Sequence, residues 1–253
     1  MGIKGAILGD IIGSAWEFNP CKNPYTCVLF NSRTKFTDDT ILSCATKFAL
    51  DSGMTYERAY RLFSDRYVFT DNGMFGRNMH KWIFGDTTFR QSIGNGSAMR
   101  VSYIGQYFDD LEVIQKEAEM SAKVTHDTED GIKGAVVTAT CMWMARNGKT
   151  KKDIYDYICS EYPEYADWDL KRYQKEYKHT ELCKDAIHLA GLAFYLSDDF
   201  ESCMRHIISV PCDADTICAI AGAFAEEYYG DTGFSDELIE KYLDNFLWQV
   251  LCR

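Results

Sequence analysis

The sequence has few basic residues and no long apolar run, and both absences exclude large classes of protein. It carries 27 lysines and arginines against 38 aspartates and glutamates, which gives a formal net charge of −11 and leaves no long polybasic tract. Such a charge argues against binding to the phosphate backbone of nucleic acids. No apolar stretch approaches the roughly 18 residues that predict a membrane-spanning helix, so we expect neither nucleic acid nor membrane as a partner.

Proline is also scarce in this chain. Only four prolines occur, and the stretch 25–162 has none. Because proline lacks a backbone donor and clashes with the preceding turn, it is the residue that most strongly forbids a helix interior. Its near absence favours a mostly helical protein.

Cysteine is common, with ten copies, but no pair has the C-x-x-C spacing of metal and redox motifs. Several, such as Cys44, Cys141 and Cys218, fall within helical apolar patterns, which predicts buried thiols in a reducing compartment rather than disulfides or a zinc site. The N-terminal stretch has one lysine and then apolar residues that Gly9 and Asp10 interrupt, a poor match to a signal peptide. We therefore predict a cytoplasmic protein.

Three stretches place apolar residues at the i, i+3, i+4, i+7 spacing of an amphipathic helix. They cover residues 41–49, 132–143 and 217–228. Further helices are expected near residues 55–68, 110–124, 151–160, 181–196, 199–209 and 235–250. Because short turns join these segments, we predict one domain over residues 1–253 that is a monomer. The stretch 161–180, dense in tyrosine and charge, is predicted to be a surface excursion.

Two acidic tetrapeptides stand where helices are expected to begin. They are Thr37-Asp38-Asp39-Thr40 and Asp213-Ala214-Asp215-Thr216. Capping of the helix start, worth about 1 kcal/mol, is one explanation for either tetrapeptide. However, a cap needs one side-chain oxygen, whereas each tetrapeptide holds two carboxylates and no lysine or arginine.

Convergence of the two tetrapeptides would create a site for divalent cations. Two carboxylates about 4 Å apart repel by about 4 kcal/mol at an effective dielectric near 20, and a bound cation removes that repulsion. Oxygen ligands of this kind suit Mg²⁺, Mn²⁺ or Ca²⁺ rather than zinc, and four carboxylates are enough to bridge two ions. Whether the two helix starts meet depends on the fold.

Two glycine-bearing loops could present backbone N–H groups to an anion. The first is Ser92-Ile93-Gly94-Asn95-Gly96, ahead of a helix-compatible run, and the second holds Gly73 and Gly76. Phosphate and pyrophosphate are the anions that such loops bind, although Asn-Gly pairs also mark ordinary turns. Both interpretations stay open at this point.

Two single residues are further candidates for a site. His126 precedes an expected helix start and could contact a ligand, although a lone histidine is more often structural or exposed. Glu17 follows an apolar segment, where a carboxylate can act as a gate or carry a proton. A solvent-facing glutamate at a helix end is an equal alternative for Glu17.

Taken in chain order, these motifs resemble the ADP-ribosylglycohydrolase family. The resemblance rests on Gly9-Asp10 with Glu17, Thr37-Asp38-Asp39-Thr40, Gly94-Asn95-Gly96-Ser97-Ala98-Met99-Arg100, Thr125-His126, and Asp213-Ala214-Asp215-Thr216 with Ala221-Gly222-Ala223. It covers residues 2–230. It implies a compact, all-α, single-domain orthogonal helical bundle whose cleft holds two Mg²⁺ or Mn²⁺ ions above an ADP-ribose site. The implied activity is hydrolysis of the bond between ADP-ribose and a modified protein side chain or a small ADP-ribosyl compound.

The resemblance also implies roles for single residues. The implied metal ligands are Thr37, Asp38, Asp39, Asp213, Asp215 and Thr216. The implied contacts of the diphosphate and its ribose are Ser92, Ile93, Gly94 and Asn95, with Gly73 and Gly76 nearby and His126 on the opposite wall. Glu17 would be a mobile acid that guards the metals, and Asp38 or Asp39 would be the general base for an attacking water.

The chain departs from the family pattern at two places. Many members have Gly-Gly just before the second acidic motif, where this chain has Pro211-Cys212, so the approach to that motif is stiffer. Some members carry an aromatic residue where Ile93 stands, which leaves the partner of the adenine ring open. The tyrosine-rich stretch 161–177 is one source of such a partner.

Two other functions compete with this one. Residues 207–210 followed by Asp213-x-Asp215-Thr216 imitate the start of a haloacid-dehalogenase-type phosphatase, but only 37 residues follow Thr216, too few for that α/β domain. A non-catalytic ADP-ribose-binding or scaffold member of the family is the second alternative. All the metal-ligand types and Glu17 are present, which favours the enzyme. The acceptor, whether arginine, serine, a nucleotide base or a small metabolite, is not indicated by these motifs.

Overall fold

The computed structural model describes residues 3–86 and 90–252. Within these ranges the chain forms fourteen α-helices and two 3₁₀-helices without a β-strand, which confirms the all-α prediction. The α-helices are α1 (Ile3–Gly13), α2 (Asp38–Ser52), α3 (Tyr56–Tyr67), α4 (Arg77–Ile83), α5 (Ser102–Tyr107), α6 (Leu111–Lys123), α7 (Glu129–Arg146), α8 (Lys151–Glu161), α9 (Leu170–Glu176), α10 (Cys183–Leu196), α11 (Phe200–Ile208), α12 (Ala214–Tyr229), α13 (Asp236–Tyr242) and α14 (Asn245–Leu251). The 3₁₀-helices are η1 (Asn95–Ser97) and η2 (Pro163–Tyr165).

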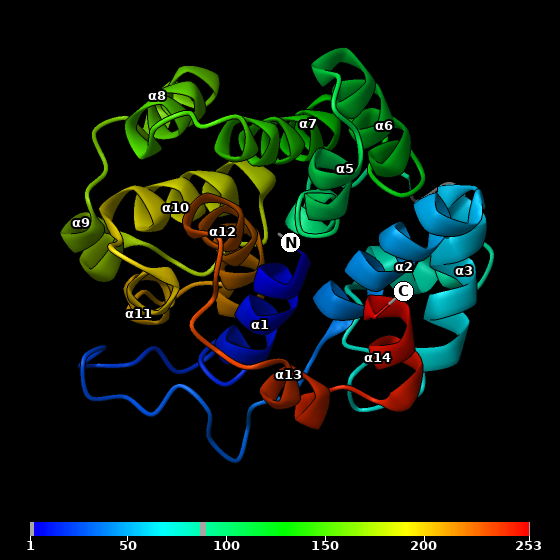
Figure 1. Cartoon of the computed structure of the whole chain (residues 1–253), viewed down its shortest axis with the longest axis horizontal. Coiled ribbons are helices and arrows are strands. Elements are labelled where there is room, and N and C mark those ends of the chain that lie inside the picture. Colours follow the sequence, from blue (N-terminus) through cyan, green and yellow to red (C-terminus); the bar gives the residue numbers. More distant parts are fainter. Residues whose placement is uncertain (1–2, 87–89, 253) are drawn as a thin grey trace.

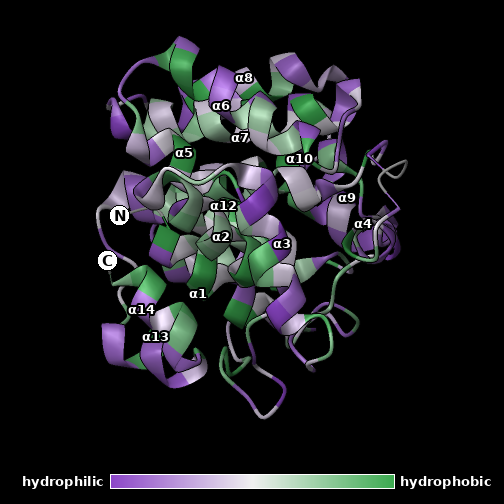
Figure 2. Cartoon of the chain, turned by 90° about the vertical axis from the view of Figure 1, so that its right-hand side faces the viewer, coloured by the Kyte–Doolittle hydropathy of each residue, from purple (hydrophilic) through white to green (hydrophobic). Residues whose placement is uncertain are grey.

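Helices α1 and α12 pack against each other in the middle of the molecule, and the other helices surround them (Figure 1). Glycines allow this contact, because Gly5 lies on Gly222 and Gly9 lies on the Cys218 carbonyl group, so that an added Cβ would overlap backbone atoms. Apolar residues gather on α1, α2 and α12, whereas α4 at the edge is mostly hydrophilic (Figure 2). The contact brings the end of α1 beside the start of α12.

The predicted helices are present, but one of them is divided, and α1, α4, α5 and α9 form where no helix was predicted. The segment predicted as one helix near 235–250 is divided into α13 and α14, because Asp244 accepts a hydrogen bond from the Leu247 N–H (2.9 Å) and starts a new helix. Residues 3–13, for which the apolar pattern predicted no element, form α1. Residues 207–210 lie at the end of α11 and in the turn after it, so the strand required by the phosphatase alternative is not formed there.

The prediction of a surface excursion over 161–180 was wrong for three of its four tyrosines. Tyr162, Tyr173 and Tyr177 are buried, and the Tyr173 hydroxyl lies 2.8 Å from Nδ1 of His188 on α10. Aromatic rings of this size stabilise a core strongly once the hydroxyl group finds a polar partner. The stretch is therefore anchored on α10, with its charged residues facing outward.

The cysteine prediction holds in part. Cys44, Cys141 and Cys218 are free and buried, as are three further cysteines. Cys21 and Cys27, however, form a disulfide in the irregular segment 14–37. The apolar helical pattern that predicts buried thiols does not extend to this segment, where no helix separates the two side chains. Among the described helices, none is both long and apolar enough to cross a membrane.

The close contact of α1 and α12 gives a first prediction. Replacing Gly9 by Ala should destabilise the protein by about 1–3 kcal/mol, because the new methyl group forces the two backbones apart, and this exceeds the roughly 1 kcal/mol that alanine adds to helix propensity. Gly76→Ala is the control, since a Cβ there meets no atom within 4 Å. Urea unfolding measures both variants, and equal stability of Gly9→Ala and wild type would contradict the packing argument.

A second prediction concerns Glu226, which is buried on α12 and accepts a hydrogen bond from the Gly5 N–H at 2.6 Å. Burial raises the pKa of Glu226 to about 7 from its usual 4.5. Because the folded protein holds this proton more tightly than the unfolded chain, stability should fall as the pH rises from about 4.5 to about 7. Glu226→Gln should remove this loss and stabilise the protein at pH 8 on the order of 2 kcal/mol.

The same variant should differ little from wild type near pH 3.5, which lies below both pKa values, so that Glu226 is mostly protonated in the folded and the unfolded state. Thermal unfolding across this pH range measures the difference, and the exposed Glu240→Gln is the matched control. A Glu226→Gln difference that does not vary with pH would show that the carboxyl group does not titrate as described.

Candidate active site

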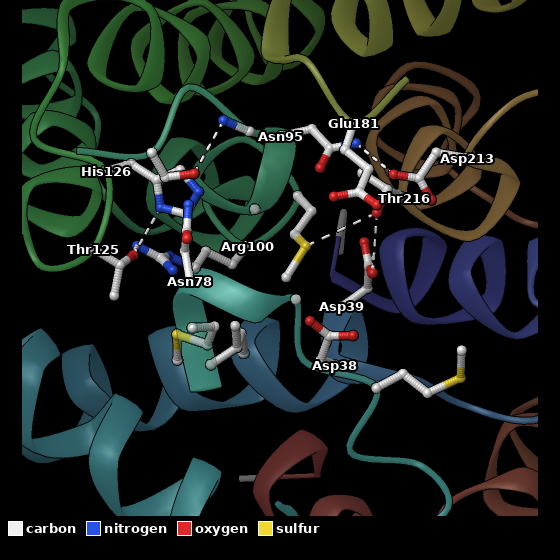
Figure 3. Close-up of a pocket in the computed structure, with 18 of the residues that line it drawn as sticks. Asp38, Asp39, Asn78, Asn95, Arg100, Thr125, His126, Glu181, Asp213 and Thr216 are labelled. Carbon is white, nitrogen blue, oxygen red and sulfur yellow. Dashed lines mark hydrogen bonds between the residues drawn. The ribbon is translucent and has the colours of Figure 1, made fainter. Parts of the chain in front are cut away.

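A cavity of about 380 Å³ opens among the starts of α2 and α12 and the loops before α4, α5 and α7. This volume falls within the range of about 300–1,000 Å³ that is typical of small-molecule sites. Acidic side chains gather at one end, and His126, Thr125 and Asn78 lie at the other (Figure 3). The residues lining it include Glu17, Asp38, Asp39, Gly76, Ser92, Gly94, Asn95, His126, Asp213, Asp215 and Thr216.

The fold brings the two acidic tetrapeptides together. Carboxylate oxygens of Asp10, Asp39 and Asp215, all buried, lie within 4.8 Å of one another. The Thr216 hydroxyl donates to Asp39 Oδ2 at 3.1 Å and so joins the second tetrapeptide to the first. Convergence, on which the metal hypothesis depended, is therefore present.

Helix capping accounts for little of this cluster. The Thr37 hydroxyl caps α2 by accepting from the Asp39 N–H, whereas Asp213 makes no side-chain cap bond to α12. Thr37 itself is buried behind the cavity, where its backbone N–H and hydroxyl donate to Asp10 at 2.9 and 2.7 Å. The remaining carboxylates need another explanation.

Asp10 organises this end of the cavity, although the sequence motifs gave it no separate role. It lies inside α1, fully buried, and also accepts from the backbone N–H of Thr40 at 3.1 Å. A carboxylate inside an otherwise apolar helix was the signal in the sequence, because such a residue is rarely buried without a polar task. Asp10 thereby fixes α2 to α1.

Burial and mutual repulsion disfavour the charged carboxylates. They raise the pKa of Asp38, Asp39 and Asp215 well above the usual range, with burial as the larger cause. The pKa of Asp213 is raised to about 6, although its Oδ2 accepts a hydrogen bond from Asn95 Nδ2 at 2.7 Å. Positive charge at this end of the cavity would relieve the repulsion.

The cluster fits divalent cations by its donor chemistry. Among the described residues, the buried Oδ1 of Asp39 has no hydrogen-bond partner, and an unsatisfied buried carboxylate oxygen is costly unless a cation completes it. The available ligands are carboxylate and hydroxyl oxygens, which suit Mg²⁺ or Mn²⁺. The residues of the cluster that line the cavity are Asp38, Asp39, Asp213, Asp215 and Thr216. Thr37 lies behind them, and its hydroxyl donates to Asp10.

The glycine loop forms a wall next to the acidic end. The Asn95 N–H donates to the Glu181 carbonyl oxygen at 2.8 Å, and a Cβ on Gly96 would lie 3.2 Å from Cε1 of His126. Ser92, Gly94 and Asn95 all line the cavity. A side chain at Gly96 would therefore crowd the imidazole ring.

Two of the predicted ligand contacts lie elsewhere. Ile93 is exposed and does not line the cavity, and its carbonyl oxygen accepts from the Cys183 N–H at 3.2 Å. Gly73 is buried against the Tyr67 carbonyl group, whereas Gly76 reaches the cavity rim. Of these positions, Gly76 alone lines the cavity.

His126 is held in one orientation by a buried network. Its Nδ1 lies 2.8 Å from the Thr125 hydroxyl, which accepts from Arg100 Nη2 at 2.9 Å. Burial, and then the Arg100 charge, lower the pKa of His126 well below its usual value. We assign the hydroxyl hydrogen to Nδ1, which leaves a neutral imidazole with Nε2 as the donor.

Glu17 lies at the mouth of the cavity, just beyond α1. It is half-buried, and burial together with the negative charge of Asp215 and Glu181 raises the pKa of Glu17 to about 8. A carboxyl group that holds its proton near neutral pH can donate it during a reaction. A raised pKa is what the expected role of Glu17 as a proton carrier requires, and that role stays a prediction.

Sequence reasoning missed three polar residues of this site. Glu181, Asn78 and Arg77 line the cavity, but none belongs to a motif named above. Histidine at 179 was given no role, yet it lies with Glu17 and Asp213 in one cluster of close side-chain ligands. Glu181 and His179 come from the loop before α10, and Asn78 comes from the start of α4. The positions of both segments depend on tertiary packing, so no local pattern could place them.

The acidic cluster predicts a response to metal. Mg²⁺ should raise the melting temperature of the wild type, and a chelator should reverse the shift, because binding to the folded state alone stabilises it by about 2.7 kcal/mol at a hundred times Kd. Asp215→Asn should be more stable than wild type in chelator and should lose most of the Mg²⁺ shift. The exposed Asp156→Asn is the control, and an equal Mg²⁺ shift in both variants would contradict the assignment.

Comparison with known proteins identifies the family. Residues 2–252 match the model of the ADP-ribosylglycohydrolase family. An uncharacterized protein of Archaeoglobus fulgidus is 28% identical over 177 residues, 64% of this chain and 54% of that protein. ADP-ribosylhydrolase ARH3 is 34% identical in Gallus gallus over 188 residues and 25% identical in Homo sapiens over 187 residues, in each case 60% of this chain and 51% of the relative.

The chain thus spans about half the length of the curated relatives it matches. A solved structure of an ADP-ribosylglycohydrolase-related protein complex has the same fold, with a TM-score of 0.72 at 20% identity over 98% of this chain and 93% of that chain. The match to the family model covers nearly every residue described above. The chain belongs to the ADP-ribosylglycohydrolase family.

Proposed function

We propose that the protein is a metal-dependent hydrolase that cleaves the glycosidic bond between ADP-ribose and an acceptor and releases ADP-ribose. The observation that carries this proposal is the convergence of the two acidic tetrapeptides at one end of a cavity whose walls hold the glycine loop and His126. Family membership supports hydrolysis of ADP-ribose linkages. The acceptor is a protein side chain such as arginine or serine, or a small ADP-ribosyl compound.

The acidic end would hold two Mg²⁺ or Mn²⁺ ions. The proposed ligands are Thr37, Asp38, Asp39, Asp213, Asp215 and Thr216. When bound, the ions would neutralise the carboxylates and orient the hydroxyl groups of the ribose next to the bond that breaks. The carboxylate oxygens near the ring would favour the oxocarbenium-like character of a glycosidic transition state.

The rest of the cavity, from the glycine loop to His126, would hold the diphosphate and the adenosine half. Ser92, Gly94 and Asn95 present the glycine loop to the cavity, and Gly76 lies at its rim. His126 is neutral, and its Nε2–H would donate a hydrogen bond to this half of the ligand without adding a positive charge to the cavity. The proposed roles of Ile93 and Gly73 are indirect, through the backbone path of their loops.

Proton transfer is assigned to two kinds of carboxyl group. Asp38 or Asp39 would take the proton of the attacking water as general base. Glu17, which holds its proton near neutral pH in the metal-free protein, would guard the mouth and help to protonate the leaving group. The two roles use different carboxyl groups, one that takes a proton and one that gives a proton.

A non-catalytic ADP-ribose-binding member of the family is the alternative. It would retain the glycine loop and His126 without needing four carboxylates, so the intact acidic end favours the enzyme. We further propose a monomeric, cytoplasmic protein. Six buried cysteines are free, as expected in a reducing compartment. The disulfide between Cys21 and Cys27 is the exception.

Release of ADP-ribose from mono-ADP-ribosylated arginine and serine substrates tests the proposal. Wild type should release ADP-ribose with Mg²⁺ or Mn²⁺ and lose the activity in chelator, and Asp215→Ala should be at least about a hundredfold slower, as expected for loss of a catalytic metal ligand. Asp156→Asn is the control.

If no substrate is cleaved but ADP-ribose raises the melting temperature in a metal-dependent way, the binding alternative replaces the enzyme. Full turnover by Asp38→Ala and by Asp39→Ala would remove both candidates for the general base.

A further inference from the structure

We propose that His179 is a positioning residue that holds the Glu17 carboxyl group at the mouth of the cavity, an inference that rests on the function proposed for Glu17. A ring nitrogen of His179, a carboxylate oxygen of Glu17 and one of Asp213 all lie within 4.8 Å of one another. Glu17 comes from the irregular segment after α1, and His179 from the loop before α10. Two segments far apart in the sequence therefore meet across the mouth.

A second contact joins the same two segments. The ring of Phe18 stacks on the ring of His179, with centroids 5.8 Å apart and an angle of 23° between the planes. Phe18 is 71% exposed, so this contact is not a by-product of core packing. Because Phe18 follows Glu17 directly, the stack places the Glu17 backbone beside the imidazole.

The Glu17 carboxyl group needs such a partner because neighbouring carboxylates repel its ionised form. Within residues 3–86 and 90–252, no hydrogen bond or ion pair to its carboxyl group is found, and the charges of Asp215 and Glu181 repel it. Lys35 attracts it, but the Lys35 ammonium group donates to a backbone carbonyl oxygen. An imidazole can accept from a protonated Glu17 or donate to an ionised one, so the contact serves both states of a proton carrier.

His179 is well placed to hold Glu17, because the residues on both sides of it are fixed. Tyr177 is buried, and its hydroxyl lies 3.1 Å from the Thr180 hydroxyl, which donates to Asp185 on α10. The Glu181 carbonyl oxygen accepts from the Asn95 N–H at 2.8 Å. The tyrosine-rich stretch thus fixes one side of the mouth, on which the imidazole stands.

The ties of the irregular segment to α11 lie beyond Glu17, at Cys21 and, through Arg205, at the carbonyl oxygens of Pro24 and Cys27. Cys21 donates its backbone N–H to the Ile208 carbonyl oxygen at 2.7 Å, and the disulfide to Cys27 closes a small loop that passes α11 (Figure 1). Tyr25, within that loop, is 80% exposed. Loss of the His179 contact should therefore release Glu17 from the mouth while the rest of the cavity stays in place.

Steady-state kinetics of ADP-ribose release test the inference. His179→Phe keeps a ring for Phe18 but removes the nitrogens, so kcat should fall about tenfold while KM changes less than about twofold. His179→Gln, which restores a polar N–H group, should recover part of this loss. In a Glu17→Ala background His179→Phe should cause no further loss, because the group it positions is absent. Lys178→Ala is the control on the same loop.

Two results of the kinetic test would overturn the inference. One is a kcat of His179→Phe equal to that of wild type. The other is the same tenfold loss in the Glu17→Ala background, since His179 would then act without Glu17. His179→Gln distinguishes positioning of Glu17 from simple packing of the His179 ring on Phe18. If only the ring mattered, His179→Gln would not recover kcat.

Hydrogen exchange of the full chain keeps the test valid if the proposed activity fails. If wild type releases no ADP-ribose, the proposed function is wrong. The positioning of Glu17 by His179 is then judged from amide exchange in peptides that cover residues 14–19. His179→Ala should speed this exchange by about threefold or more, with Lys178→Ala unchanged. Equal exchange in His179→Ala and wild type would overturn the inference whether or not the protein is an enzyme.

Discussion

The backbone contact between α1 and α12 is the constraint on which the site depends. Glycines at 5, 9 and 222 let the two helices approach more closely than side chains normally allow, and close packing transmits small displacements without loss. Asp10 on α1 and Asp215 on α12 are therefore placed by one rigid pair of helices. The start of α2 is then attached to the same pair through the hydrogen bonds that Asp10 accepts.

This arrangement places several mutually repelling groups inside an apolar core. Residues next to the carboxylates, such as Ile12, Leu42 and Ile217, are buried, and they provide the stabilisation that the charged cluster lacks. A site of this kind is less stable alone than it would be with neutral side chains, a common cost of preorganised function. The gain is that the carboxylates keep their positions before any ligand arrives.

The sequence predicted the helical class and the chemistry of the acidic end, because both are recorded in local patterns. Apolar periodicity places α2, α7 and α12, and the composition of the two tetrapeptides identifies the ligand type. It did not predict that 235–250 would divide at Asp244 or that tyrosines of 161–180 would be buried. These outcomes depend on partners distant in the sequence, such as His188 for Tyr173.

The positions within the candidate site were predicted unevenly for the same reason. The four aspartates of the tetrapeptides lie at the starts of α2 and α12. Their places could be predicted because the apolar pattern that follows each tetrapeptide shows where its helix begins. Ile93 and Gly73 were expected at the ligand, but their loops turn those residues toward Cys183 and Tyr67 instead. Glu181 and His179 were absent from the motifs, since a loop's path is decided by what it packs on.

The buried Arg100 gives the cavity a direction. Its guanidinium group is fully buried, donates to the Ser121 carbonyl oxygen at 2.9 Å and lines the cavity on the side of His126, whereas the aspartates stand at the other side (Figure 3). Opposite charges at the two ends of a low-dielectric space create an electric field along its length. If ADP-ribose is the ligand, as proposed, its diphosphate would be drawn toward the Arg100 end while it enters, and an uncharged mimic of the diphosphate would lose that guidance.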